Sequence, residues 1–107
     1  MNSGNVFSLG DNYLREDKER FEDLFNNNNL RIERIVSEGH ITDENTWLQE
    51  LKNEWVLLLQ GNAIIIFENG DKFELKTGNY LFIPSNMKHR VTYTSVNPKC
   101  IWLAIHF

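Results

Sequence analysis

Short apolar runs separated by turn residues follow one another from Leu30 to the end of the chain. Residues 56–59 and 64–67 are apolar at consecutive positions. Because neighbouring strand residues point to opposite faces, both faces of these strands must be covered. About seven or eight such strands, with no helical pattern between them, predict a small all-β fold, an antiparallel jelly-roll barrel. The other runs are RIERIVS, KFEL, YLFI, RVTYT and CIWLAIHF.

Two local patterns refine this fold. Asn69-Gly70 lies between two strand-like runs and predicts a hairpin with a type I′ turn, in which both central residues have positive φ. Trp55, Leu57 and Leu59 alternate with the inward-facing residues of their strand, so they form an apolar patch on its outer face. Such a patch predicts a homodimer contact or docking of a short helix expected near the N-terminus.

The first 30 residues differ from the rest, so we divide the chain into an N-terminal arm, residues 1–30, and a barrel, residues 31–107. Phe21, Leu24 and Phe25 recur at helical spacing, and Asp17 can cap the first turn. The asparagine run that follows is typical of a helix end. The pattern predicts a short N-terminal helix that packs on the barrel, because it is too short to be stable alone.

Composition narrows the classes of function. The chain has 107 residues, enough for one core, with 11 Lys and Arg against 15 Asp and Glu, a net charge of −4. Without a basic stripe, nucleic-acid binding is not expected. The single Cys100 excludes an internal disulfide. The N-terminus lacks signal-peptide features and no apolar run approaches the ~20 residues of a membrane span, so we expect a cytoplasmic protein with no membrane contact.

The most distinctive segment is GNYLFIPSNMKHRVTY, where Gly78 opens a strand, Pro84 ends it and His89 begins the next strand. This spacing resembles the second motif of the cupin family, G-x5-P-x-G-x2-H-x3-N. Asn86 stands at the middle glycine of that motif, and Tyr93 stands at its terminal asparagine.

The first cupin motif, G-x5-H-x-H-x3–4-E-x6-G, is only half present. Glu54 and Gly61 have the family's spacing, but the two histidine positions fall on Leu48 and Glu50, or on Trp47 and Gln49 with the longer spacing. Cupins bind a divalent metal through those two histidines, the glutamate and the second-motif histidine. The resemblance therefore implies that only Glu54 and His89 are carried over as metal ligands.

A metal site here needs further donors, because first-row metals commonly take at least three protein ligands. Glu50 shares the face of Glu54 by strict alternation, whereas Gln49 reaches it only if the strand bulges. His89, Glu54 and Glu50 or Gln49 would form a carboxylate-rich site for Mn, Fe, Zn or Ni. The alternative is a hydrogen-bonded Glu–His pair without metal. No organic cofactor is expected.

Parity also predicts a cavity around this site. Tyr93 and Val91 share the parity of His89, and Trp102 and His106 share one face of the last strand with Ala104. His106 could instead be solvated at the strand end, and His40 lies in a polar loop that is normally exposed. The expected cavity residues are Val56, Leu58, Phe82, Val91, Tyr93, Trp102 and His106.

Two main functions remain open. The first is a stand-alone cupin that binds a divalent metal and acts on, or binds, a small organic molecule. The second is a metal-free module that binds a ligand or dimerises, which the missing histidine pair favours. A purely structural partner of another protein has no support beyond the apolar outer strands. The resemblance selects no reaction type, because a fold does not define a function.

Overall fold

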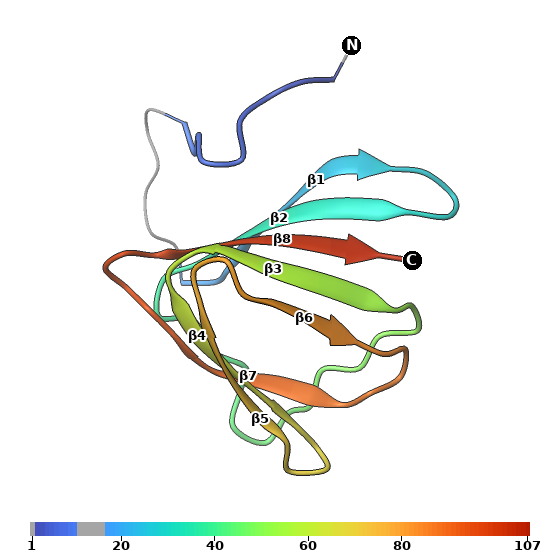
Figure 1. Ribbon diagram of the computed structural model, residues 1–107, viewed down its shortest axis with the longest axis vertical. Coiled ribbons are helices and arrows are strands. Elements are labelled where there is room, and N and C mark those ends of the chain that lie inside the picture. Colours follow the sequence, from blue (N-terminus) through green and yellow to red (C-terminus); the bar gives the residue numbers. More distant parts are fainter. Residues whose placement is uncertain (1, 11–16) are drawn as a thin grey trace.

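The computed structural model describes residues 2–10 and 17–107 (Figure 1), and the described residues form two antiparallel sheets without a helix. The five-stranded sheet has the order β1-β2-β8-β3-β6 and the three-stranded sheet has the order β5-β4-β7. The all-β jelly-roll fold expected from the sequence is therefore confirmed. The strands are β1 (Arg20–Asn26), β2 (Arg31–Ser37), β3 (Glu54–Gln60), β4 (Asn62–Phe67), β5 (Lys72–Lys76), β6 (Tyr80–Ile83), β7 (His89–Thr94) and β8 (Cys100–His106).

The hydrophobic core lies between the two sheets. Val56 and Leu58 of β3 point into it, and Trp55 and Leu57 alternate with them on the outer face, where they are half-buried. This alternation follows from the pleat of the strand. The core combines aliphatic side chains with two aromatic rings and one thiol: Val56, Leu58, Ala63, Ile65, Phe67, Leu75, Leu81, Ile83, Cys100, Trp102 and Ala104.

The segment from Gly78 to His89 folds as its residues predict. Gly78 has φ of 91° and turns the chain into β6, which ends at Ile83 directly before Pro84. Asn86 has φ of 64°, the one positive value among non-glycine residues in the described chain. Asparagine tolerates this left-handed conformation, so Asn86 can occupy the place of the motif's glycine.

The hairpin at Asn69-Gly70 joins β4 and β5, but its turn is not type I′. Gly70 has φ of 97°, and Asn69 is not in the positive region. The amide of Gly70 donates to the carbonyl of Phe67 (2.9 Å), and the amide of Phe67 donates to the carbonyl of Asp71 (2.9 Å). The loop is thus one turn followed by a left-handed glycine, a longer hairpin connection than the two-residue form.

The N-terminal helix is corrected to a strand. Residues 20–26 form β1, which pairs antiparallel with β2 and places Arg20 opposite Val36. The register shifts between Asp23 and Phe25, so Leu24 is an extra residue in a bulge. A short isolated helix is marginal in water, whereas the edge of β2 offers a row of backbone partners, so pairing overrides the helical spacing.

No helix in the described part of the chain is long and apolar enough to cross a membrane.

Candidate functional site

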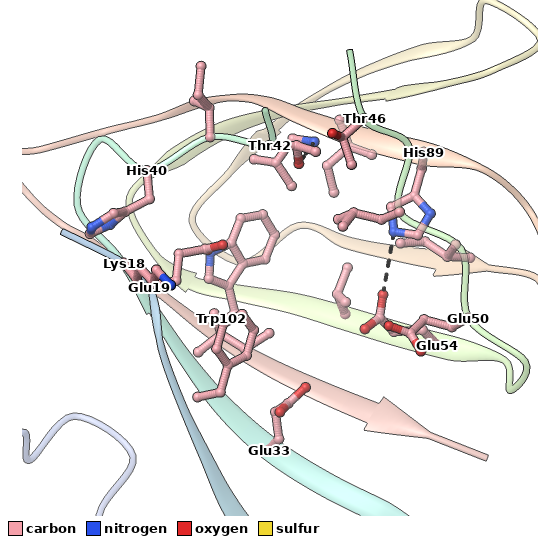
Figure 2. Close-up of a pocket in the computed structure, with 18 of the residues that line it drawn as sticks. Lys18, Glu19, Glu33, His40, Thr42, Thr46, Glu50, Glu54, His89 and Trp102 are labelled. Atoms are coloured by element: carbon pink, nitrogen blue, oxygen red, sulfur yellow. Dashed lines mark hydrogen bonds and ion pairs between the residues drawn. The ribbon is translucent and has the colours of Figure 1, made fainter. Parts of the chain in front are cut away.

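A cavity of about 810 Å³ opens between the sheets, and Figure 2 shows the side chains around it. The five-stranded sheet supplies one wall through Glu33 of β2, Glu54 of β3 and both Trp102 and His106 of β8. Ile65, His89 and Val91 of the three-stranded sheet line the opposite side. Charged and apolar side chains therefore meet in one space.

The loop after β2 lies along this cavity. The amide of Thr42 donates to the carbonyl of Val91 (2.9 Å), and the Thr42 hydroxyl accepts from the amide of Val91 (3.0 Å). The hydroxyl of Thr94 donates to the carbonyl of His40 (2.6 Å). These bonds tie the loop to β7, so His40 lines the cavity instead of extending into solvent.

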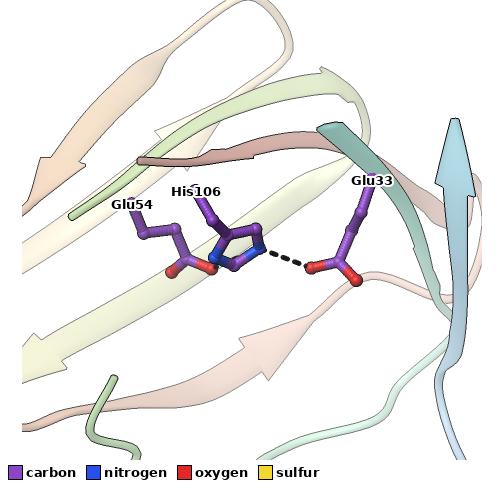
Figure 3. Close-up of side chains that lie close together, drawn as sticks. All are labelled: Glu33, Glu54 and His106. Atoms are coloured by element: carbon purple, nitrogen blue, oxygen red, sulfur yellow. Dashed lines mark hydrogen bonds and ion pairs between the residues drawn. The ribbon is translucent and has the colours of Figure 1, made fainter. Parts of the chain in front are cut away.

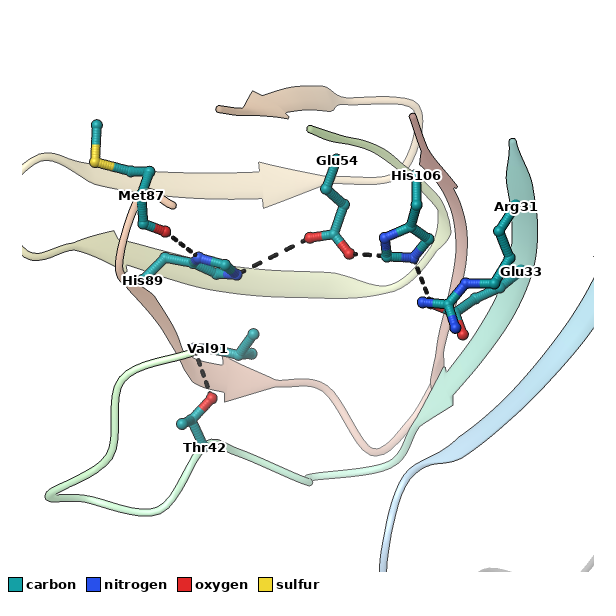
Figure 4. Close-up of polar contacts among 8 residues, drawn as sticks. All are labelled: Arg31, Glu33, Thr42, Glu54, Met87, His89, Val91 and His106. Atoms are coloured by element: carbon teal, nitrogen blue, oxygen red, sulfur yellow. Dashed lines mark hydrogen bonds and ion pairs between the residues drawn. The ribbon is translucent and has the colours of Figure 1, made fainter. Parts of the chain in front are cut away.

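Four polar side chains, buried or nearly so, form a row across the cavity, and we call Glu33, Glu54, His89 and His106 the carboxylate–histidine row (Figure 4). His89 Nε2 lies 3.9 Å from Glu54 Oε1, and His106 Nε2 lies 3.5 Å from Glu54 Oε2. His106 Nε2 also lies 2.7 Å from Glu33 Oε1. Each member comes from a different strand, β2, β3, β7 or β8, so the fold itself assembles the row.

The ring of His89 is held in one tautomer. Its Nδ1 lies 2.9 Å from the carbonyl oxygen of Met87, which can only accept, so Nδ1 carries the donated proton. In neutral imidazole, Nε2 then presents a lone pair toward Glu54 Oε1. Two acceptors face each other across 3.9 Å, an arrangement that a cation between them stabilises.

Glu33, Glu54 and His106 have the geometry of a metal-binding trio (Figure 3). One ligand atom from each residue lies within 4.8 Å of the other two. Donors at about 2.0–2.2 Å from a shared ion are separated by roughly such distances. Two carboxylates balance the charge of a divalent ion, so this donor set fits the metal that the cupin resemblance implies.

Burial and mutual contact shift the pKa values in the row. Burial raises the pKa of the Glu54 carboxyl, and His106 and His89 partly oppose that shift. The hydrogen bond to Glu33 raises the pKa of His106 above its ordinary value, against the effect of burial. A proton therefore competes with a metal ion for the ring nitrogen of His106.

The structure separates Glu50 from Gln49. Glu50 lines the cavity, and its charge raises the pKa of Glu54. The side-chain amide of Gln49 donates to the carbonyl of Asn86 (3.0 Å), and Gln49 does not line the cavity. Leu48 lines the cavity as well, whereas Trp47 lies under the guanidinium of Arg90. Leu48 and Glu50 therefore occupy the cavity-facing places of the family's histidine pair.

Of the expected cavity residues, Val56, Val91, Trp102 and His106 line the cavity. The other three, Tyr93, Phe82 and Leu58, lie elsewhere, so their predicted places were wrong.

Tyr93 is displaced by a bulge. Ile65 pairs with Val91 but Ile64 pairs with Tyr93, so Thr92 is an extra residue that reverses the alternation of β7. Tyr93 is 48% exposed as a result, and Thr94 points inward.

The other two corrections follow from position along the strands. Phe82 lies between the buried Leu81 and Ile83 and points to the outer face, where it is 46% exposed. Leu58 points inward, but it is fully buried in the core and does not reach the cavity.

Sequence reasoning missed Glu33. The segment RIERIVS places apolar residues on both parities, so a glutamate there looks like part of a solvated face. In the structure Glu33 is 5% exposed and pairs in register with Ala104 of β8. The available sequence signal is that Glu33 shares the parity of the apolar Ile35.

Comparison with known proteins agrees with the cupin resemblance of the sequence. A family model described as "Cupin domain" matches residues 35–106. No curated protein sequence matches the chain.

Among solved structures, the "putative mannose-6-phosphate isomerase" of Ralstonia eutropha JMP134 is similar, with 31% identity, a TM-score of 0.89, and coverage of 97% of this chain and 95% of that one. A cupin superfamily protein of Desulfitobacterium hafniense DCB-2 has 20% identity, a TM-score of 0.73, and coverage of 89% and 82%. FeII HppE in complex with substrate has 18% identity, a TM-score of 0.68, and coverage of 81% and 52%. The last two likenesses show the fold alone.

Proposed function

The chain belongs to the cupin family, and from that premise we propose that it binds a divalent metal ion through Glu33, Glu54 and His106 and uses it to hold a small organic molecule. The observation that supports this proposal is the convergence of three ligand atoms within 4.8 Å from three different strands. His89, next to Glu54 on the other side, completes the polar surroundings.

The charge of the cavity supports a cation. Its lining includes the six carboxylates of Asp17, Glu19, Glu33, Asp43, Glu50 and Glu54, but only the two permanent cations of Lys18 and Arg31. Glu33 is buried and Glu54 is half-buried, and such carboxylates are stable when they are paired or bound to a metal. The same lining disfavours an anionic ligand away from the ion, so the sugar phosphate in the name of the Ralstonia eutropha neighbour fits poorly.

Two oxygen donors and one imidazole suit manganese, iron(II) or zinc better than a soft metal. Three protein ligands leave coordination positions for water or for an oxygen of the organic molecule, which the bound ion would polarise. Glu33, Glu54 and His106 would hold the ion. His89, with its Nε2 lone pair directed into the cavity, would accept a proton from a molecule bound beside it.

A metal-free ligand-binding module is the second candidate, and one contact favours it. His106 Nε2 already lies 2.7 Å from Glu33 Oε1, shorter than the usual separation of two ligands of one ion. A protonated His106 between Glu33 and Glu54 would satisfy the row without metal. The cavity would then bind a small molecule through polar contacts alone.

A metal inventory distinguishes the two candidates. Protein purified without a histidine tag is analysed by mass spectrometry, before and after incubation with manganese, iron(II) or zinc. We expect close to one ion per chain in the wild type and less than about a tenth of that in Glu54→Gln. Glu74→Gln, on the exposed side of β5, is the matched control and should bind metal like the wild type. An empty wild type that cannot be loaded rejects the metal proposal and leaves the second candidate.

A further inference from the structure

The end of the cavity away from the carboxylate–histidine row contains a second buried polar group. The indole Nε1 of Trp102 donates to the hydroxyl of Ser37 (3.2 Å), and that hydroxyl donates to Glu19 Oε2. Ser37 is fully buried, and Glu19 lines the cavity from the segment just before β1. The chain of donors has one direction, because an indole N–H can only donate and a carboxylate can only accept.

The two polar ends are far apart along the same strands. Glu33 and Ser37 are four residues apart on β2, as are His106 and Trp102 on β8. At about 3.3 Å per residue, each pair spans roughly 13 Å. Figure 2 shows Trp102 between Glu19 and His40 at one end of the cavity and Glu54 and His89 at the other.

The middle of the cavity is apolar along the two sheets, whereas Thr42 and Thr46 of the loop after β2 border it from another side (Figure 2). Ile35, Val56, Ile65 and Val91 line it together with the indole of Trp102. A ligand that fills this cavity therefore needs an apolar surface where it meets these five side chains.

The Glu19 carboxyl offers an acceptor at its end of the cavity. Ser37 satisfies one carboxyl oxygen of Glu19. His40 lines the same end, and its Nδ1 accepts from the amide of Glu38 (2.8 Å). Burial raises the pKa of the Glu19 carboxyl, and the hydrogen bond from Ser37 partly opposes that shift. A hydroxyl group can donate to a carboxyl oxygen of Glu19, so an alcohol matches this end of the cavity.

We propose that Glu19, held by Ser37 and Trp102, is a hydroxyl-binding subsite for an elongated ligand whose other end lies at the carboxylate–histidine row. The ligand class is a neutral alcohol terminus joined by an aliphatic or aromatic spacer to an oxygen-bearing head. The placement of the head at a metal ion rests on the function proposed above. The hydroxyl subsite does not depend on that ion.

The first test uses metal-free protein, kept in chelator, and two probes of equal size. Hexanol can donate a hydrogen bond, whereas methyl pentyl ether cannot. NMR titration follows the indole N–H signal of Trp102, which reports on Ser37 directly. We expect hexanol to shift this signal and to bind at least about fivefold tighter than the ether, as a hydrogen bond to a buried carboxyl requires.

The matched variants are Glu19→Met and Glu44→Met. Glu44 lies on the exposed loop and does not line the cavity, so its variant should keep the preference for hexanol. In Glu19→Met the two probes should bind within about twofold of each other. Three results would each overturn the subsite. The wild type could bind hexanol and the ether equally, or its indole signal could stay unmoved at saturating hexanol. A folded Glu19→Met could also keep the full preference for hexanol.

The second test asks whether one ligand reaches both the Glu19 subsite and the carboxylate–histidine row. Zinc-loaded protein is titrated by calorimetry with ω-hydroxy carboxylates from hydroxybutanoate to hydroxyoctanoate and with the unsubstituted acids of equal length. We expect one chain length at which the hydroxy acid gains at least about fivefold, and loss of that gain in Glu19→Met with zinc affinity unchanged. A wild type that binds no zinc rejects the proposed metal function while the hexanol result still supports the subsite. Zinc binding without any hydroxyl gain overturns the subsite alone.

Discussion

Glu33 and Arg34 are neighbours on β2, and they show how differently the two faces of the five-stranded sheet handle a buried charge. They are 5% and 6% exposed, but successive strand residues point to opposite faces. Glu33 points into the cavity, and Arg34 points to the outer face. The same strand thus buries one charge of each sign on its two sides.

Arg34 has fixed partners for two of its three guanidinium nitrogens, Nη1 and Nη2. Its guanidinium pairs with Glu22 of β1 (2.5 Å) and donates to the carbonyls of Val6 (3.1 Å) and Ser8 (2.7 Å). These contacts bind the N-terminal segment and β1 to the sheet. Arg34 therefore stabilises the fold and points away from the cavity where a ligand would bind.

Glu33 has a different set of neighbours. It shares His106 with a second carboxylate, Glu54, so two acids compete for one imidazole proton. Arg31 Nη2 also lies 3.8 Å from Glu33 Oε1, but the Arg31 side chain is 39% exposed, so the buried groups still hold two carboxylates to one imidazole. An added cation stabilises such a cluster, whereas Arg34 already has Glu22 as its counter-charge. Burial of a charged side chain alone therefore does not mark a ligand-binding site. What marks the site is the imbalance of charge among the buried groups.

The largest expected effect is on the outer face, where we predict that a homodimer forms around Trp55. Trp55 stacks on Tyr80 with ring centroids 5.6 Å apart, and Tyr80 remains 66% exposed. Trp55→Arg should weaken dimerisation by about a hundredfold or more, as for a central aromatic hot spot. Analytical ultracentrifugation measures this, with Phe73→Lys on the three-stranded sheet as the control. A wild type that stays monomeric, or a Trp55→Arg dimer of unchanged affinity, rejects the prediction.

The second effect concerns stability. Arg34→Met should lower the free energy of unfolding by about 2–4 kcal/mol, because it leaves Glu22 and the carbonyls of the N-terminal segment without their donor. Zinc affinity should stay within about twofold. Lys72→Met, which removes an exposed ion pair with Glu74 (3.6 Å), is the control and should change stability by less than about 1 kcal/mol. A loss of zinc binding in folded Arg34→Met would show that the outer face also contributes to the metal site, against this prediction.

Glu33→Gln is the complementary change on the inner face. The amide oxygen still accepts from His106, so the metal-free protein should lose less than about 1 kcal/mol of stability. Zinc affinity should fall by about tenfold to a hundredfold, because a charged ligand becomes a neutral one. Isothermal titration calorimetry measures this affinity. Equal zinc affinity in Glu33→Gln and wild type would show that Glu33 is only a structural partner of His106.

The smallest effect is a dependence of stability on pH. Glu33 raises the pKa of His106 above its ordinary value of 6.5, so the native state holds this proton more tightly than the unfolded chain. The stabilisation is complete below 6.5 and is lost as the pH rises through the native pKa, and the raised pKa of Glu54 acts in the same direction at lower pH.

In chelator, the melting temperature should therefore fall over this window. Zinc should reverse the slope, because the ion displaces the proton. His106→Gln should flatten it. A melting temperature that rises in chelator over the same window contradicts the assigned protonation.

The parts of the fold that depend on neighbouring residues were predictable. Gly78, Pro84 and His89 produce their turns and strand ends through local backbone preferences, and Asn86 keeps the left-handed position of the missing glycine. The strand alternation of residues 54–60 was predictable for the same reason. These features need no knowledge of what lies across the barrel.

Features that depend on distant partners were not predictable. Glu33 and His106 are 73 residues apart, and only the pairing of β2 with β8 brings them together. The bulge at Thr92 breaks the period-2 rule that placed Tyr93 in the cavity. The helical spacing of Phe21 and Leu24 was real, but the open edge of β2 decided the structure of that segment.

The most direct test of the proposed metal site is an anomalous difference map from a manganese-soaked crystal of the wild-type protein. We predict one peak in the cavity, about 2.0–2.3 Å from a carboxylate oxygen of Glu33, one of Glu54 and a ring nitrogen of His106. A cavity without a peak, with His106 still bonded to Glu33 at saturating manganese, would contradict it.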